Sequence, residues 1–206
     1  MVHYKLTYFF FNGLGEPIRQ IFALAGVDFE DHRVQREEWP ALKESTPFGK
    51  MPVLEVDGKK LPQSKAIARY LGRKFGFAGN GEWEQAQVDA WADQINDYMT
   101  SVDPFFRYKA GFAEGDADAE FNDVVVKARD TFFPLVVKQL KEAGSGYLVG
   151  NKVSWADLFL NYHVETFLGF RPDYIDKYPE IAAHLKKVRD IPELKKWVSQ
   201  RPSAPF

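Results

Sequence analysis

Residues 53–71, VLEVDGKKLPQSKAIARYL, decide the fold of the first part of the chain. Two short apolar segments flank Asp57-Gly58, a pair that readily adopts the positive φ angles of a two-residue hairpin turn. Ser64 then follows as a helix cap, and apolar residues recur at helical spacing as far as Phe75. The stretch therefore predicts two antiparallel strands, at 53–56 and 59–61, and a helix after them.

The residues before this stretch predict a strand, a helix and a second strand. Tyr4, Leu6 and Tyr8 alternate along one face of the first strand, and Glu16-Pro17 opens a helix because proline is tolerated in the first turn. A weaker strand follows at 29–34. The two strands of such a βαβ unit should be parallel. Together with the hairpin and its helix, they predict a thioredoxin-like α/β domain.

Helical periodicity dominates the rest of the chain. An apolar stripe between Val88 and Val102 predicts one long helix, and a second is expected at 117–143, with Pro134 kinking or interrupting it. The sequence thus predicts a boundary between an α/β domain at residues 1–79 and an all-α domain at residues 80–206.

Three further helices are expected near the end of the chain. Ser154 and Asp157 match a capping box, in which each residue bonds a free backbone N–H at the start of a helix. Shorter helices are expected at 177–189 and 193–200.

Composition excludes several classes of function. The 27 Lys and Arg against 29 Asp and Glu leave no broad cationic surface, so nucleic acid is not an expected partner. The longest apolar segment is far below the ~20 residues of a membrane span, and the first residues lack a leader-like apolar stretch, so a cytoplasmic protein without a membrane partner is expected. The absence of cysteine means that sulfur chemistry must come from a bound thiol.

The histidines give no sign of a metal site. The four are scattered through the chain without paired spacing: His3, His32, His163 and His184. No metal is therefore expected.

Tyr8 is a candidate for activating a thiol. Tyr8 lies at the end of the first strand, so its hydroxyl is expected to face the start of the first helix. There it could donate a hydrogen bond to a thiolate. A free thiol with a pKa of ~8.5 is only slightly ionised at neutral pH, so such a donor would raise the population of the nucleophile. The alternative is an ordinary core aromatic, which periodicity alone favours.

Two neighbouring motifs could bind a peptide. In residues 47–53, PFGKMPV, a cis bond before Pro52 would turn the backbone of Met51 toward an extended ligand, whereas a trans proline on an edge strand is the alternative. Gln63-Ser64 stands at a helix start, which suits a carboxylate, although Ser64 could equally be a plain cap.

These motifs together resemble a sigma-class cytosolic glutathione transferase, and its nematode members most of all. The motifs are Tyr8 at the end of YKLTY, Glu16-Pro17-Ile18-Arg19, PFGKMP at 47–52, QSKAIARYL at 63–71 and VSWAD at 153–157. They occur in family order and spacing and cover essentially the whole chain. The resemblance implies a homodimer that conjugates its co-substrate glutathione to hydrophobic electrophiles in detoxification.

Carried over residue by residue, the resemblance implies how glutathione is held. Tyr8 would donate to the sulfur, and Met51, before Pro52, would pair with the cysteinyl backbone. Gln63 and Ser64 would hold the γ-glutamyl end.

The remaining contacts implied by the resemblance concern the two ends of glutathione. Trp39 and Lys43 would contact the glycine carboxylate, with Lys50 adding positive charge there. Asp97 would reach across the dimer to the amino group of the ligand in the partner's site. The alternative for all four is a solvated surface.

The second substrate should enter beside the sulfur, against an apolar wall. The expected lining residues, for which ordinary core packing is the alternative, are Phe9, Phe10, Leu14, Met99, Phe105, Phe106 and Tyr108. Phe48 could wedge into the partner subunit, as an aromatic does in related classes, or bury locally.

Two departures from the pattern leave other functions open. Leu14 stands where several sigma-class members carry arginine, so the substrate preference could differ, and Asn96 replaces an acid of some relatives, which argues against a divalent-metal effect. The alternatives are a carrier of haem or another bulky apolar ligand, a glutathione-dependent prostaglandin isomerase, and a structural relative such as a lens crystallin. The retained Tyr8, Gln63 and Ser64 argue against the last.

Overall fold

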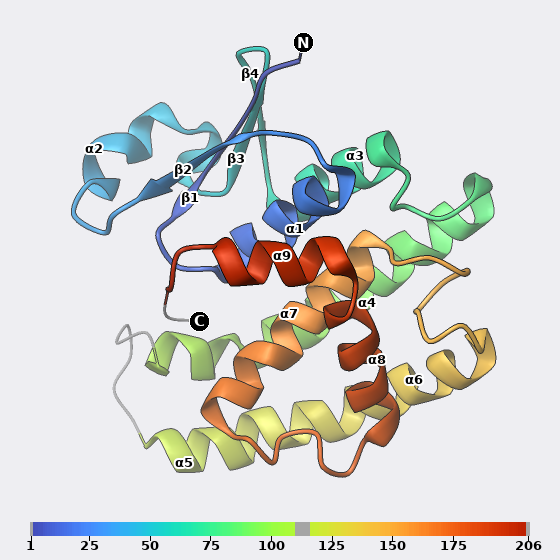
Figure 1. Cartoon of the computed structure of the whole chain (residues 1–206). Helices are drawn as coiled ribbons and strands as arrows, with labels where there is room; N and C mark the ends of the chain where they lie inside the picture. Colours follow the sequence, from blue (N-terminus) through green and yellow to red (C-terminus); the bar gives the residue numbers. More distant parts are fainter. Residues whose placement is uncertain (1, 110–115, 205–206) are drawn as a thin grey trace.

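The computed structural model describes residues 2–109 and 116–204. Its first part is a four-stranded mixed sheet with helices beside it, and its second part is a stack of helices (Figure 1). The strands are β1 (Tyr4–Phe9), β2 (Glu30–Val34), β3 (Val53–Val56) and β4 (Lys59–Pro62), in the order β2-β1-β3-β4.

The pairing of the strands confirms the predicted βαβ unit and hairpin. β1 pairs parallel to β2, with Tyr8 opposite Arg33, and antiparallel to β3, with Thr7 opposite Val53. β3 and β4 form the antiparallel hairpin. The helices of this part are α1 (Glu16–Ala25), α2 (Trp39–Leu42) and α3 (Ser64–Phe75), with 3₁₀ turns at η1 (Gly13–Gly15), η2 (Lys43–Ser45) and η3 (Pro47–Gly49).

The second part is all-helical in its described residues, as the periodicity predicted. Its elements are α4 (Gly81–Lys109), α5 (Ala117–Glu120), the π-helical η4 (Phe121–Val126), α6 (Lys127–Ala143), α7 (Trp155–Phe170), α8 (Pro179–Arg189) and α9 (Pro192–Gln200). None of the helices in the described ranges is both long and apolar enough to span a bilayer.

Two local predictions differ from the structure. An interruption at Pro134 is wrong, because Pro134 lies inside α6 without ending it, whereas a kink there stays a prediction. The long helix changes earlier, where the segment η4 is π-helical. Phe133 and Val136 are fully buried on either side of Pro134, so tertiary packing outweighs the loss of one helix hydrogen bond. Ser64 is the first residue of α3 rather than its cap, because Gln63, at φ 77°, makes the turn into the helix without a side-chain cap bond.

One continuous hydrophobic core joins the two parts. α7 is buried along most of its length, and its Trp155 packs against Gly72 of α3, where an added Cβ would lie 2.7 Å from the indole. The predicted capping box is confirmed, with Ser154 and Asp157 each bonding the backbone N–H of the other. α3 ends at Phe75 and α4 begins at Gly81, while the exact domain boundary after residue 79 stays a prediction.

Candidate functional site

Strand register gathers most of the predicted glutathione-binding residues at one end of the sheet. Thr7 lies opposite Val53, and Val53 lies opposite Pro62. The residues next along each strand therefore lie at the same end of the sheet. They are Tyr8 on β1, Met51-Pro52 before β3 and Gln63-Ser64 after β4. Three segments that are far apart in the sequence meet here.

Tyr8 combines burial with a single backbone donor. Its side chain is only 6% exposed, and its hydroxyl oxygen accepts a hydrogen bond from the N–H of Leu14 at 3.0 Å. Burial raises the pKa of Tyr8 to about 12, although the Leu14 N–H and the Arg19 guanidinium both act to lower it. The hydroxyl therefore stays protonated at neutral pH and is a donor rather than a base.

Arg19 braces the loop that follows Tyr8. Its side chain is completely buried, and its Nε donates to Asp31 of β2 at 2.9 Å. Its Nη groups donate to backbone carbonyls of the loop, at 3.4 Å for Phe9 and 3.2 Å for Asn12, and the guanidinium lies 5.8 Å from the centre of the Tyr8 ring. Arg19 was expected only as part of a motif, and the sequence carries no signal of this role, since an arginine on a helix is usually exposed.

The predicted glutathione-binding end of the sheet has two unusual backbone features. The Met51–Pro52 peptide bond is cis, the geometry that the sequence left open. Gln63 has a φ of 77°, a conformation that non-glycine residues rarely adopt and that nothing in the sequence indicated. Ser64 is buried beside it, whereas the side chain of Gln63 is exposed. Such rare backbone conformations tend to occur at ligand sites.

The residues predicted for the glycine end lie before β3, with Trp39 on α2, Lys43 on η2 and Lys50 directly after η3. The Trp39 ring packs edge-on against Phe9, with 5.5 Å between ring centres, so Trp39 borders the Tyr8 end of the sheet. The Lys43 side chain lies over Gly49, the residue before Lys50 in the sequence. Both lysines are exposed and free to meet an anion.

The predicted apolar lining divides into two groups. Phe9, Phe10 and Leu14 are half-buried next to Tyr8, and half-buried positions on α4 carry Met99, Phe106 and Tyr108. Phe105, in contrast, is 1% exposed and packs among the rings of Phe121 and Phe167. Phe105 therefore fits the core alternative.

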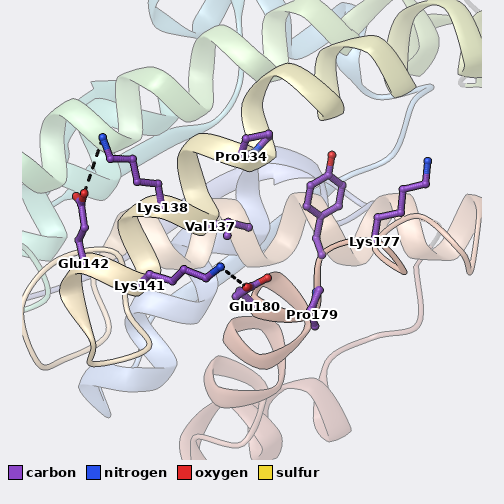
Figure 2. Close-up of a pocket in the computed structure, with 9 residues that line it drawn as sticks. Pro134, Val137, Lys138, Lys141, Glu142, Lys177, Pro179 and Glu180 are labelled. Atoms are coloured by element: carbon purple, nitrogen blue, oxygen red, sulfur yellow. Dashed lines mark ion pairs between the residues drawn. The ribbon is translucent and has the colours of Figure 1, made fainter.

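An open groove lies elsewhere on the surface. The groove has a volume of about 690 Å³, lies between α6 and α8, and is lined by none of the predicted site residues. Figure 2 shows its side chains, among which Lys138 pairs with Glu142 and Lys141 pairs with Glu180. Asp97 is exposed on α4. Within the described residues, no group of three or more metal-ligating side chains occurs.

Two family models match the chain, one for each part. Residues 4–73 match the glutathione S-transferase N-terminal domain, and residues 97–201 match the glutathione S-transferase C-terminal domain.

Curated relatives align over nearly the full length. The chain is 50% identical to probable glutathione S-transferase 7 of Caenorhabditis elegans, with all of both chains covered, and 41% identical to human hematopoietic prostaglandin D synthase, with 98% of each covered.

Solved structures agree with these matches. NaGST-2 is 52% identical with a TM-score of 0.97, and a Nu-class glutathione S-transferase of Haemonchus contortus is 52% identical with a TM-score of 0.92, both over the full length of each chain. Na-GST-3 of Necator americanus, described as monomeric, is 50% identical with a TM-score of 0.96, covering 99% of this chain and 100% of its own. The chain therefore belongs to the glutathione S-transferase family and is a transferase that uses glutathione as its co-substrate.

Proposed function

We propose that Tyr8 is the catalytic residue and that its hydroxyl donates a hydrogen bond to the thiolate of glutathione. The observation that carries this proposal is the Leu14 N–H bond to the Tyr8 oxygen, 3.0 Å long, which occupies an acceptor position and leaves the hydroxyl proton free to point elsewhere. A neutral phenol in a buried setting stabilises a nearby anion more strongly than water does.

The proposed reaction is a substitution or addition at an apolar electrophile. The thiol proton leaves to solvent, and the sulfur then forms a bond to an electrophilic carbon. With an aryl halide, the carbon–halogen bond breaks and the halide departs. Tyr8 keeps its proton throughout, so its contribution is electrostatic and positional.

In the proposed pose, glutathione lies along the end of the sheet where its predicted binding residues meet. Its sulfur lies at Tyr8, its cysteinyl backbone pairs with Met51 before Pro52, and its γ-glutamyl end lies at Gln63 and Ser64. The glycine carboxylate lies toward Trp39, Lys43 and Lys50, which come before β3 in the sequence. Rare backbone at Gln63 and a buried hydroxyl at Ser64 support the γ-glutamyl position.

Hydrophobic electrophiles are the proposed second substrates. Half-buried aromatic and aliphatic side chains beside Tyr8 suit apolar compounds without selecting one. The sigma-type class is likewise a proposal, since one relative at 52% identity is described as Nu-class.

A glutathione-dependent prostaglandin isomerase is the second candidate function. Its support is the 41% identity to human hematopoietic prostaglandin D synthase over 98% of each chain. Leu14 weakens it, because the neutral side chain supplies no cation beside the sulfur. Assaying prostaglandin conversion beside aryl halide conjugation, with haem as a competitor, would separate the two activities and the carrier alternative.

We also propose a homodimer. Phe48 is 73% exposed at the tip of a turn, and an apolar side chain so exposed is a common sign of an interface. A groove of about 330 Å³ between α4 and α6, which includes Trp91 and Leu135, offers it a partner surface. Asp97 would then lie near the partner's glutathione. The relative described as monomeric makes the oligomeric state a direct question for this chain.

The proposed role of Tyr8 is tested by Tyr8→Phe, with Tyr147→Phe as a matched control, because Tyr147 lies in the segment between α6 and α7 and its ring packs against Lys187. Losing one charge-assisted hydrogen bond should lower kcat/KM for an aryl halide by about 10- to 100-fold, and the control should retain full activity. Unchanged turnover in Tyr8→Phe would rule the role out.

We also propose a cytoplasmic location, because the glutathione pool lies in the cytoplasm. Cell fractionation would test that location.

A further inference from the structure

Glu16 is a buried carboxylate to which the proposed mechanism gives no role. Its side chain is completely buried at the first position of α1. Its Oε1 accepts hydrogen bonds from Gln20 Nε2 at 3.3 Å, Trp197 Nε1 at 2.8 Å and Arg201 Nη1 at 2.5 Å. Because a buried charge is costly unless it is hydrogen-bonded, these donors fix the position of the carboxylate.

Two of the three donors come from the far end of the chain. Trp197 lies on α9 and Arg201 directly follows it, so the bonds span 181 and 185 residues. α9 lies alongside α1 (Figure 1). Glu16 therefore joins the start of α1 to the C-terminal helix at a defined point.

The backbone of Glu16 closes the turn that contacts Tyr8. The Glu16 N–H donates to the Asn12 carbonyl at 2.9 Å, which encloses Gly13, Leu14 and Gly15. Inside that turn, the Leu14 N–H donates to the Tyr8 hydroxyl. The amide that orients Tyr8 is thus only two residues from the anchored carboxylate.

The turn is held from both sides. Arg19 bonds the Asn12 carbonyl and is itself anchored to β2 through Asp31. Arg19 Nη1 also lies 3.8 Å from Glu16 Oε2, the carboxylate oxygen that α9 leaves free. One side of the turn therefore depends on the sheet, and the other side depends on α9.

We propose that Glu16 and Arg201 form a positioning pair, through which the C-terminal helix sets the hydrogen bond from Leu14 to Tyr8. This inference rests on the proposed role of Tyr8 as the thiolate donor. An N–H bonded to the phenolic oxygen polarises the O–H and makes it a stronger donor. If the turn shifts, Tyr8 donates less strongly, and the bound thiol ionises at a higher pH.

The experiment compares Arg201→Gln, Trp197→Phe and Arg201→Lys in the full chain, each well below its own unfolding temperature. The apparent pKa of bound glutathione is measured from the ultraviolet absorbance of the thiolate and from the pH dependence of kcat/KM. Arg201→Gln and Trp197→Phe should each raise it by about half a unit, which is about threefold in kcat/KM at a pH below the thiol pKa. At a pH well above the thiol pKa, the rates of both variants should equal those of the parent enzyme. Arg201→Lys keeps a cation at this position and should therefore raise the thiol pKa less than Arg201→Gln does.

Lys195→Met is the matched control, because it also removes a cation from α9 but one that pairs with Asp190 instead. Its pH profile should be unchanged. A loss of rate that is equal at every pH, or a profile that Arg201→Gln and Trp197→Phe leave unmoved, would overturn the positioning pair. Tyr8→Phe is measured alongside: if it too leaves the profile unmoved, the proposed function fails, and if it shifts the profile while Arg201→Gln does not, only the positioning pair fails.

Discussion

The ring of Tyr8 lies against the backbone of Gly15 so closely that a Cβ added there would be 2.5 Å from Tyr8 Cδ1. Gly15 has an ordinary helical backbone, with φ −77° and ψ −29°, so any residue could adopt its conformation. The need for glycine at this position is therefore steric. The turn after β1 and the ring of Tyr8 fit each other because Gly15 has no side chain, and the same holds for Gly13, where a Cβ would lie 2.5 Å from the Tyr8 hydroxyl oxygen.

Gly15→Ala should displace the Tyr8 hydroxyl. Because a misplacement of about 1 Å can cost about 100-fold in rate, we expect kcat/KM to fall by about 10- to 100-fold. The control is Gly169→Ala on α7, where an added Cβ meets nothing within 4 Å and should leave activity unchanged. Steady-state kinetics with an aryl halide decide the matter, and full activity in Gly15→Ala would show that the ring position is not critical.

The pH dependence of turnover should rise and then level off. kcat/KM increases as the bound thiol ionises, and because the pKa of Tyr8 is raised to about 12, its hydroxyl remains a donor throughout the neutral and mildly alkaline range. No falling limb from Tyr8 is expected until the pH approaches that value. A descending limb near neutrality that is absent from Tyr8→Phe would contradict a protonated donor.

His163 should make the fold sensitive to acid. Burial, with a smaller effect of Lys65, lowers the pKa of His163 to about 3 in the folded chain, whereas an unfolded histidine titrates near 6.5. Between these values only the unfolded state binds the proton, so unfolding becomes easier as the pH falls below about 6.5, by up to about 1.4 kcal/mol per pH unit. Urea unfolding of the parent and of His163→Phe at several pH values should show a shallower pH dependence in the variant. Identical slopes would mean that His163 is not the group responsible.

Asp157 should contribute more to stability than an exposed acid does. Its fully buried carboxylate accepts from Leu148 N–H at 2.8 Å, Ser154 N–H at 2.7 Å and Ser154 Oγ at 2.6 Å. Asp157→Ala leaves these donors unpaired inside the core and should cost about 2 to 4 kcal/mol of unfolding free energy. Asp123→Ala, which removes an exposed partner of Lys127, should change it by less than about 0.5 kcal/mol. Equal effects in urea titrations would refute the distinction.

Phe48→Ser should weaken self-association if the proposed homodimer forms. The substitution removes an apolar side chain that is 73% exposed in the single chain, so the fold itself should be undisturbed. Sedimentation equilibrium should show a dimer for the parent and a larger monomer fraction for the variant. Val198→Ser, at another exposed apolar position, is the control. A parent chain that is monomeric at all concentrations would exclude the dimer.

The strands and most helices could be predicted because their signals are local. Asp57-Gly58 dictates a tight turn whatever surrounds it, and Ser154 with Asp157 caps a helix three residues away. The predictions at Pro134 and Ser64 fail for different reasons. Buried tertiary packing keeps α6 continuous through Pro134, which no local signal indicates. At Ser64 the cap position is taken by the adjacent Gln63, whose positive φ is not a preference of its residue type.

The site was recognised from motifs, whereas its supports were not. Tyr8, Met51 and Gln63 occur at family spacing, but periodicity alone made Tyr8 an ordinary core residue. In the sequence, Glu16 and Arg19 stand out only as members of a motif at the start of a helix. Both are buried because the ends of the chain and β2 supply their partners, and no local pattern signals that pairing.

The sequence by itself determined the strands and the longer helices, the absence of any cysteine thiol, and the set of motifs that marks the family. Only the tertiary structure decided that Leu14 N–H meets the Tyr8 oxygen, that Phe105 belongs to the core, and that Arg201 bonds Glu16. The physical reason is range: turn and helix preferences depend on neighbours within a few residues, whereas burial and hydrogen-bond partners depend on which distant segments the fold brings together.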